Sequence, residues 1–307
     1  MFTDWSPKVL KKLLVILLGL TIALLCGCTT VKKQQCTIHN SEIEPDNTIV
    51  LQQGYPNSVL RVATLNLAHG RKDSSNQLLV AKGTHKENLN DIADVLTKHK
   101  PHVVALQEAD ASSRWSGSFD HVAYLASAAK YPWRTHERNA ENWLYSYGTA
   151  LLSALPLIET IKHTFEPSPP TLDKGFVLAQ IKWPSNDGKK SRKVDVISVH
   201  LDFSRQSVRD KQIKEMMETV SIRMNPTIIL GDFNSEWLGK ASVIKALATK
   251  SRFSSYRPES GDYNSYKDKR LDWILISNDM EFANYHVLPE ILSDHLMVLA
   301  EIRFKSN

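Results

Sequence analysis

The stretch that decides the fold is Thr227-Ile228-Ile229-Leu230-Gly231-Asp232-Phe233-Asn234. Its first four residues are apolar or β-branched, which predicts a fully buried strand, and we expect Gly231 to end that strand. Asp232 and Asn234 follow directly. Polar side chains just past a strand in a layered α/β structure usually serve a site. The alternative is an ordinary turn in which both side chains satisfy local hydrogen bonds, so the rest of the chain has to decide.

Strand-like and helix-like segments alternate on both sides of this stretch. Strands predominate, and several neighbouring strands are expected to be antiparallel. This pattern predicts an α/β (α+β) fold in which two packed mixed sheets are flanked by helices, a four-layer sandwich. The expected strands cover 59–67, 102–106, 133–137, 147–153, 157–165, 175–183, 193–201, 227–230, 270–276, 281–288 and 296–304, and the expected helices cover 85–100, 119–130, 204–224 and 241–250.

Length and charge indicate one mildly basic domain after the N-terminal region. The chain has 307 residues, 42% of them hydrophobic, and a formal net charge of +5. Strand-like runs extend over most of the chain without a linker-like gap, which favours a single domain, and we expect a monomer. There is no run of like charges typical of a nucleic-acid-binding tail, so the basic balance gives only modest support for an anionic substrate.

The N-terminus has the pattern of a targeting segment. Three lysines precede the apolar run 13–25, which is too short for a comfortable membrane span. The next residues, Leu25-Cys26-Gly27-Cys28, resemble the lipobox of bacterial lipoproteins, in which the signal is removed and the final cysteine is acylated. We therefore expect residues 1–27 to be a signal peptide, 28–57 a polar tether and 58–307 the folded domain. An uncleaved anchor or a plain signal peptide is the alternative.

This interpretation places the protein in the bacterial cell envelope, lipid-anchored through Cys28 and facing the periplasm or the exterior. Removing residues 1–27 takes away three lysines and one aspartate, so the mature chain would carry a net charge of +3. Cys36 would then be the one remaining free thiol, and a single thiol cannot form an intrachain disulfide. The exported fold must therefore depend on its hydrophobic core.

Polar residues recur at the ends of the apolar runs. Any one of them alone is explained by a turn or a cap, but six such positions in one domain are hard to ascribe to turns. They are Asn66, Glu108, His200, Asp232 with Asn234, Asp272, and Asp294 with His295.

The order of these motifs resembles the endonuclease/exonuclease/phosphatase superfamily. That group includes deoxyribonuclease I-like nucleases, apurinic endonucleases, neutral sphingomyelinases and inositol-polyphosphate 5-phosphatases. The resemblance covers about residues 59–305 and implies a deoxyribonuclease I-like fold. It is carried by Leu65-Asn66, Leu106-Gln107-Glu108, Ser198-Val199-His200-Leu201, Gly231-Asp232-Phe233-Asn234, Leu271-Asp272-Trp273-Ile274 and Ser293-Asp294-His295.

The resemblance implies a divalent metal ion. Glu108 would be the main ligand, with Asn66 nearby and Asp294 as a second ligand. Carboxylate and amide oxygens suit Mg²⁺, with Mn²⁺ as an alternative. Zinc is disfavoured because the chain has no closely spaced His/Cys set.

The same resemblance implies roles for the remaining positions. Asp232 would orient or deprotonate the attacking water, and Asn234 would hold the phosphate or that water. His295 would contact a phosphoryl oxygen, with Asp272 fixing its tautomer and favouring the imidazolium. His200 would donate to the phosphate or the leaving group. Which group acts as the base is left open, and the alternative for both histidines is an ordinary core position.

Four further residues are weaker candidates. Asp202 could belong to the site, but capping the helix that follows it is an equal alternative. The others are basic residues that could contact a substrate: Arg114, Arg134 and Arg138.

We expect an exported, membrane-anchored, Mg²⁺-dependent phosphoesterase that cleaves P–O bonds by direct attack of water. A nuclease-like substrate is preferred, because loops with Arg and Tyr could hold a phosphate backbone. The alternative is a phospholipid phosphodiesterase or phosphatase, sphingomyelinase-like or phosphoinositide phosphatase-like, acting on a lipid head group. The lack of a long hydrophobic insertion counts mildly against lipid. A catalytically silent binding lipoprotein is the non-enzymatic alternative.

Overall fold

A computed structural model describes residues 39–40, 59–184, 191–239 and 242–305. The expected signal segment, Cys28 and nearly all of the expected tether lie outside the described residues, and so these expectations stay predictions. No helix among the described residues is long and apolar enough to cross a membrane.

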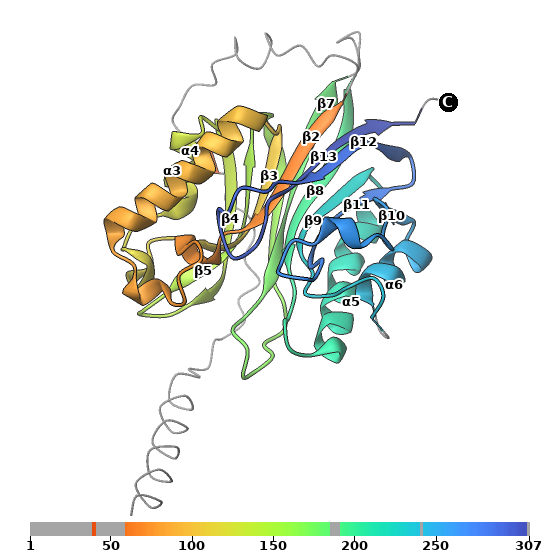
Figure 1. The fold of residues 1–307 in the computed structure, drawn as a ribbon. Helices are drawn as coiled ribbons and strands as arrows, with labels where there is room; N and C mark the ends of the chain where they lie inside the picture. The colour runs from red at the N-terminus through yellow and green to blue at the C-terminus, as the bar shows by residue number, and fades with distance from the viewer. Residues whose placement is uncertain (1–38, 41–58, 185–190, 240–241, 306–307) are drawn as a thin grey trace, which may run out of the picture.

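Two mixed β-sheets form the centre of the molecule (Figure 1). Most neighbouring strands are antiparallel, but β2 pairs with β3 and β8 pairs with β9 in parallel. The first sheet has the order β1 (His39–Asn40), β4 (Trp133–Glu141), β5 (Ser146–Ser153), β3 (Val103–Asp110), β2 (Leu60–Asn66), β13 (Val298–Phe304), β12 (Met280–Val287). The second has the order β10 (Phe253–Ser255), β11 (Asp272–Ser277), β9 (Thr227–Asp232), β8 (Ser191–His200), β7 (Gly175–Pro184), β6 (Leu157–Thr164).

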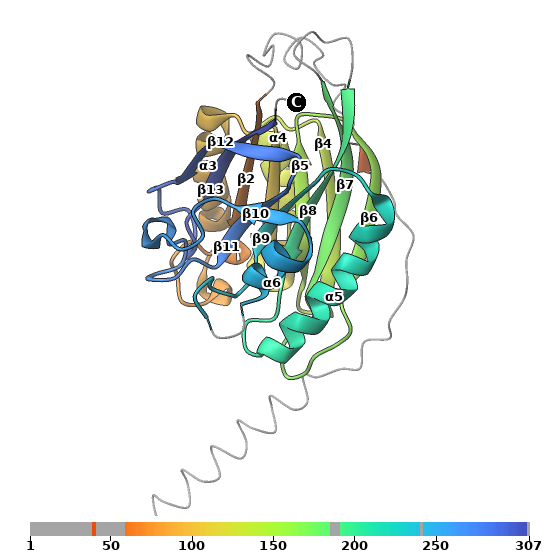
Figure 2. The same cartoon turned by 90° about the vertical axis from the view of Figure 1, so that its right-hand side faces the viewer.

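Helices cover the outer face of each sheet (Figures 1 and 2). On the first sheet lie α3 (Lys82–His99) and α4 (His121–Ala128), and on the second lie α5 (Gln206–Arg223) and α6 (Val243–Lys250). The prediction of a four-layer sandwich is therefore confirmed. Short 3₁₀ turns complete the connections: η2 (Ala68–Gly70), η3 (Gln77–Leu79), η4 (Arg114–Ser116) and η5 (Gly261–Tyr263).

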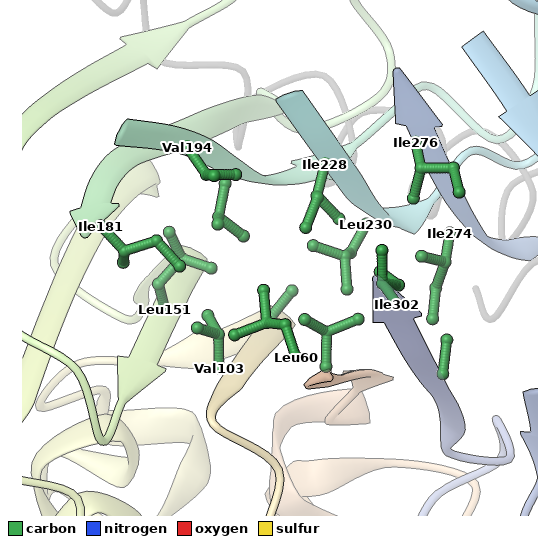
Figure 3. Close-up of a cluster of buried hydrophobic side chains, with 14 of the residues drawn as sticks. Leu60, Val103, Leu151, Ile181, Val194, Ile228, Leu230, Ile274, Ile276 and Ile302 are labelled. Atoms are coloured by element: carbon green, nitrogen blue, oxygen red, sulfur yellow. The ribbon is translucent and has the colours of Figure 1, made fainter. Parts of the chain in front are cut away.

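The main hydrophobic core lies between the two sheets. Figure 3 shows Leu60 and Val103 of the first sheet meeting Val194 and Ile228 of the second. Along β2 the side chains alternate, because Leu60 faces the second sheet whereas Ala63 packs under the helices. Strands buried on both faces read as continuous apolar runs, which is why the runs were visible in the sequence.

Gly231 does not end its strand, contrary to the expectation from the sequence. β9 continues through Asp232, which lies opposite both His200 and Asp272 in the sheet register. Gly231 has φ +148°, and a Cβ atom at this position would lie 2.0 Å from the carbonyl oxygen of Val199. Glycine is required here because the neighbouring backbone comes too close for any side chain.

Gly231→Ala should lower the free energy of unfolding by about 3 kcal/mol, because either β8 or β9 must shift to admit the methyl group. Thermal unfolding followed by circular dichroism measures the effect, and for a domain of this size we expect Tm to fall by about 10 °C. The matched control is Gly83→Ala in α3, where the added Cβ meets no atom within 4 Å. That change should stabilise the helix slightly. An unchanged Tm for Gly231→Ala would contradict this account of the strand.

His102 makes the stability of the fold depend on pH. It is buried, and its Nδ1 accepts a hydrogen bond of 2.8 Å from the Arg61 backbone N–H. Burial, assisted by the positive charge of Arg61, lowers the pKa of His102 to about 3. The folded protein therefore keeps His102 neutral below pH 6.5, whereas the unfolded chain takes up a proton, so stability falls as the pH drops from 6.5 towards 3.

Denaturant unfolding measured between pH 7 and pH 3.5 should show this loss, which amounts to about 4 kcal/mol at most for His102. In His102→Gln, the slope of the free energy of unfolding against pH should be shallower over the same window. Identical slopes for the two proteins would show that His102 is not the group responsible.

Candidate active site

Strand ends from both sheets converge at one end of the sandwich. In the second sheet, Asp232 lies between His200 and Asp272 in register. From the first sheet, Asn66 at the end of β2 donates through Nδ2 to Asp232 Oδ2 over 3.1 Å. The apolar strands bury these polar ends together, so residues 166 positions apart in the sequence meet in one site.

The Asp232 carboxylate has polar neighbours on both of its oxygens. Its Oδ1 accepts a hydrogen bond of 2.9 Å from the backbone N–H of Asn234. Its Oδ2 lies 3.5 Å from His200 Nε2 and 4.0 Å from His295 Nε2. Burial raises the pKa of Asp232 although His295 opposes the shift. A carboxylate with a raised pKa binds a proton more readily than an ordinary one, which suits it to accept a proton from water.

His295 forms an ion pair with Asp272. Its Nδ1 lies 2.7 Å from Asp272 Oδ2, which also accepts a 2.7 Å hydrogen bond from Ser265 Oγ. Burial alone would lower the pKa of His295, but the pairing with Asp272 outweighs burial and raises it to about 10. The ring is therefore an imidazolium at neutral pH, with Nε2 on the side of Asp232.

The pKa of His200 is shifted in the opposite direction from that of His295. Burial, together with Lys174, lowers its pKa well below the usual value, so it is neutral. Lys174 Nζ lies 3.4 Å from His200 Nδ1 and 4.0 Å from Glu108 Oε1. Lys174 was not among the predicted site residues. A signal existed, because Lys174 directly precedes Gly175, which lies opposite His200 in the predicted strand pair.

The sequence predicted that Glu108 directly follows an apolar strand. In the structure Glu108 instead lies inside β3, at a bulge. Leu106 pairs with Ala150 and Ala109 pairs with Gly148, so β3 contains one extra residue at this point. Glu108 has φ +46°, in the left-handed region. A bulge that redirects a side chain beside a site is a common device, and this one turns Glu108 towards Lys174 and the site.

The Glu108 carboxylate is charged but has no close hydrogen bond among the described residues. Oε2 lies 3.4 Å from His69 Nε2, and Lys174 is at 4.0 Å. Burial raises the pKa of Glu108, but His69 and Lys174 outweigh it and bring the value to about 2. An ionised carboxylate with oxygens left over is suited to ligate a hard cation.

His69 and Asp110 are further site residues that the sequence reasoning missed. His69 Nδ1 lies 2.8 Å from Asp110 Oδ2, and Trp115 Nε1 donates to Asp110 Oδ1 over 2.8 Å. This pair presents the other ring nitrogen of His69 to Glu108. Asp110 shares a strand face with Glu108, two residues away, which was a usable signal. His69 is held at φ +56° in η2, and no strand or helix periodicity predicts that position.

The two remaining predicted ligands have partners within the protein. Asn66 Oδ1 accepts from the backbone N–H of Ala68 over 3.0 Å, which leaves the oxygen one further lone pair. Asp294 Oδ2 pairs with Arg71 Nη2 at 2.5 Å. Their roles as ligands stay predictions.

The cluster fits a metal ion in its donor chemistry. Asp232, Asp272 and His295 offer ligand atoms that all lie within 4.8 Å of one another, so this buried group could bind a metal if the His295 ring gives up its proton. Asp272 Oδ1 is buried and has no hydrogen-bond partner within the described part of the chain. Two of the three groups are carboxylates, whose oxygens are ligands for divalent cations.

The weaker candidates do not join the site. Asp202 Oδ1 accepts from the backbone N–H groups of Ser204 and Arg205, which forms a turn ahead of α5, whose N-cap residue is Arg205. The three basic candidates make no hydrogen bond or ion pair with a site residue in the ranges that the structure describes: Arg114, Arg134 and Arg138.

Solved structures share this fold at low sequence identity. A protein of Beutenbergia cavernae described as endonuclease/exonuclease/phosphatase is 18% identical with a TM-score of 0.64, covering 80% of this chain and 72% of its own. A mannosyl-6-phosphatase of Bacteroides thetaiotaomicron is 15% identical with a TM-score of 0.59, covering 80% and 100%. The catalytic domain of human Nocturnin, with a bound sulfate anion, is 18% identical with a TM-score of 0.58, covering 80% and 94%.

No curated protein matches the chain. Its sequence does match the Endonuclease/Exonuclease/phosphatase family over residues 63–295, which include all the predicted site positions. The match spans most of the chain and agrees with the two-sheet fold. The chain therefore belongs to the endonuclease/exonuclease/phosphatase family.

Proposed function

We propose that this protein is a Mg²⁺-dependent phosphoesterase that hydrolyses a P–O bond by direct attack of water. The observation that carries the proposal is the set of charged and polar side chains around Asp232. A buried carboxylate of raised pKa lies beside one cationic and one neutral histidine, and the charged Glu108 interacts electrostatically with the same two histidines. Hydrolysis of an anionic ester needs a base that takes a proton from water and positive charge that stabilises the phosphoryl oxygens, and this cluster supplies both.

Asp232 takes the proton from the attacking water, and Asn234 holds that water or a phosphoryl oxygen. Asn234 has φ +47°, and its Nδ2 donates to the Leu201 carbonyl oxygen over 3.0 Å. The left-handed backbone and this hydrogen bond fix the side chain, so that its carbonyl oxygen and second amide hydrogen remain for a ligand. An amide at this position adds no charge that would repel the substrate.

His295 contacts a phosphoryl oxygen with its cationic ring. Asp272 keeps the ring protonated and oriented through the 2.7 Å contact. His200, neutral and next to Lys174, is placed to donate a hydrogen bond to the phosphate or the leaving oxygen. The positive charge of the His295 ring stabilises the negative charge that develops on the phosphoryl oxygens as water attacks.

Glu108 would hold Mg²⁺ together with Asn66, with Asp294 as the second candidate ligand and Mn²⁺ as the alternative ion. A bound divalent cation neutralises phosphate charge and polarises the phosphoryl oxygen. Glu108 is prepared for this role because its carboxylate is ionised and has no close hydrogen bond to a described residue.

The N-terminal sequence supports export and anchoring as part of this proposal. Residues 1–27 would be removed as a signal and Cys28 would be acylated, tethering the enzyme to the cell envelope as a monomer. The test is metabolic labelling of the full chain with a radioactive fatty acid. Label should enter the wild type and be lost in Cys28→Ala, and equal labelling of both would reject Cys28 as the acylation site.

The experiment that tests the activity compares substrates side by side. The chain from Thr29 to Asn307, which keeps every described residue, is incubated with plasmid DNA, RNA, sphingomyelin or phosphoinositides. We expect Mg²⁺-dependent release of product from at least one substrate and no release with chelator. Absence of hydrolysis of all four in Mg²⁺ and in Mn²⁺ would leave the binding lipoprotein as the better account.

Nucleic acid, the substrate preferred from the sequence, makes a distinct prediction in the same assay. Binding to a phosphate backbone releases condensed counterions, and it weakens steeply with added salt because this release then gains less free energy. Nuclease activity should therefore fall strongly between 50 and 200 mM salt, a window over which such binding typically drops by orders of magnitude. An activity that is indifferent to salt would argue against nucleic acid.

A further inference from the structure

Exposed apolar side chains gather on the loops that surround the candidate active site. Ten large hydrophobic side chains are exposed among the described residues, and six of them lie on these loops. We call these six the apolar rim: Leu78, Leu79, Trp143, Leu172, Phe203 and Leu238.

The rim residues come from five separate connections that all emerge at the site end of the sheets. These connections follow β2, β4, β6, β8 and β9. In the second sheet the strand register shows this, because Gly175, where the connection after β6 ends, pairs with His200, and His200 pairs with Asp232. In the first sheet, β2 ends at Asn66 beside Gln107, and the end of β4 pairs with Tyr147, which also pairs with Asp110. In Figure 1 the connections after β6 and β8 form the lower end of the molecule, away from the C-terminus.

The side chains of the rim are strongly exposed. Leu79 is 81% exposed, Leu238 77%, Trp143 69% and Phe203 64%. Single exposed hydrophobic residues are ordinary, but a group around one site indicates a surface that is covered in use. Because five connections contribute, the rim fits a broad apolar surface better than one extended peptide.

The charge of the site inside the rim limits which ligands fit it. Lys174 is buried inside the site, with its Nζ 3.4 Å from His200 Nδ1 and 4.0 Å from Glu108 Oε1, and its ammonium group suits an anionic substrate. A ligand that matches both features has an anionic phosphate ester and an adjoining apolar body. That is the chemistry of a phospholipid at a membrane surface, with the head group in the site and the rim in contact with the acyl boundary.

We propose that the apolar rim docks the enzyme on a phospholipid surface and that the substrate is a phosphate ester of a lipid in that surface. This inference rests on the proposed phosphoesterase function and adds the substrate class. The N-terminal sequence agrees with this inference, because the proposed acylation of Cys28 would hold the mature enzyme beside a membrane. The sequence has no long hydrophobic insertion that could enter a membrane. In the structure, the apolar side chains on several short loops could serve the same purpose.

The test uses a rim variant, Trp143→Ser with Phe203→Ser and Leu238→Ser, in the chain from Thr29 to Asn307. The matched control is Ile222→Ser with Met224→Ser at the far end of α5, where the two side chains are 81% and 90% exposed. Each protein is assayed with Mg²⁺ on vesicles of phosphatidylethanolamine, phosphatidylglycerol and phosphatidylcholine. The soluble probes are the dihexanoyl forms of the same lipids below their micelle concentrations.

On vesicles the rim variant should lose about 100-fold in hydrolysis and should no longer sediment with them, because three apolar side chains no longer enter the lipid. Its rate on the dihexanoyl lipids should equal that of the wild type, and the control should match the wild type in both assays. Unchanged vesicle hydrolysis by the rim variant would overturn the proposal, as would an equal loss on the soluble lipids.

The failure of the wider function is distinguishable from the failure of this inference. If the wild type hydrolyses neither lipid form and none of plasmid DNA, RNA, sphingomyelin and phosphoinositides, the phosphoesterase proposal itself fails. If it hydrolyses DNA but neither lipid form, the phosphoesterase proposal stands and the lipid-docking proposal is wrong.

Discussion

Asp232→Asn should lower kcat by about 10³-fold while the protein remains folded. The amide cannot accept the proton of the attacking water, and loss of a positioned general base typically costs 10²–10⁴-fold. The measurement is steady-state hydrolysis of the substrate identified in the panel, at saturating Mg²⁺. KM should change little, because the size of the side chain is preserved and the base acts chiefly in the transition state.

The same substitution should not lower the thermal stability. Burial raises the pKa of Asp232, so the folded protein holds its charged form at a cost, and a neutral amide removes that cost. We therefore expect a Tm equal to or above that of the wild type. A large loss of activity together with a lower Tm would indicate a structural role, and retention of full activity would exclude Asp232 as the base.

Glu108→Gln should strongly lower metal-dependent activity by weakening Mg²⁺ binding. The substitution keeps the shape of the side chain and removes the charge that a hard divalent ion prefers. We expect the dissociation constant for Mn²⁺, measured by electron paramagnetic resonance, to rise at least 100-fold, in line with losses seen at metal sites. Activity at 1 mM Mg²⁺ should fall at least as much and recover in part at higher Mg²⁺.

The matched control for this substitution is Glu281→Gln. Glu281 lies on β12, where its carboxylate pairs with Arg303 at the surface, away from the site. That variant should bind Mn²⁺ and hydrolyse substrate like the wild type. Unchanged Mn²⁺ affinity in Glu108→Gln would exclude Glu108 as the main ligand.

The parts of the site that could be predicted from the sequence are those attached to regular strands. Asn66, Asp232 and Asp272 terminate or begin continuous apolar runs, and a run buried on both faces has a clear sequence signature. Once those strands were located, the fold class followed from their number and from the helices between them. Register then brings His200 and Asp272 to Asp232 without further information.

The parts that could not be predicted depend on local backbone departures and on tertiary contacts. The bulge that redirects Glu108 has no periodic signature, and Gly231 looked like a strand end although it serves close strand packing. Lys174 and His69 reach the site from an irregular connection and a 3₁₀ turn, respectively. The apolar rim is equally hidden, because its residues are scattered in sequence and become a group only when five connections meet.

The measurement that tests the central claim most directly is hydrolysis in H₂¹⁸O. The wild-type chain with Mg²⁺ is allowed to turn over a phosphate ester once, and both products are analysed by mass spectrometry. Direct attack of water on phosphorus predicts one ¹⁸O in the phosphate-bearing product and none in the released alcohol, with no product formed by Asp232→Asn on the same time scale. Label in the alcohol, or product formation by Asp232→Asn at the wild-type rate, would contradict the account.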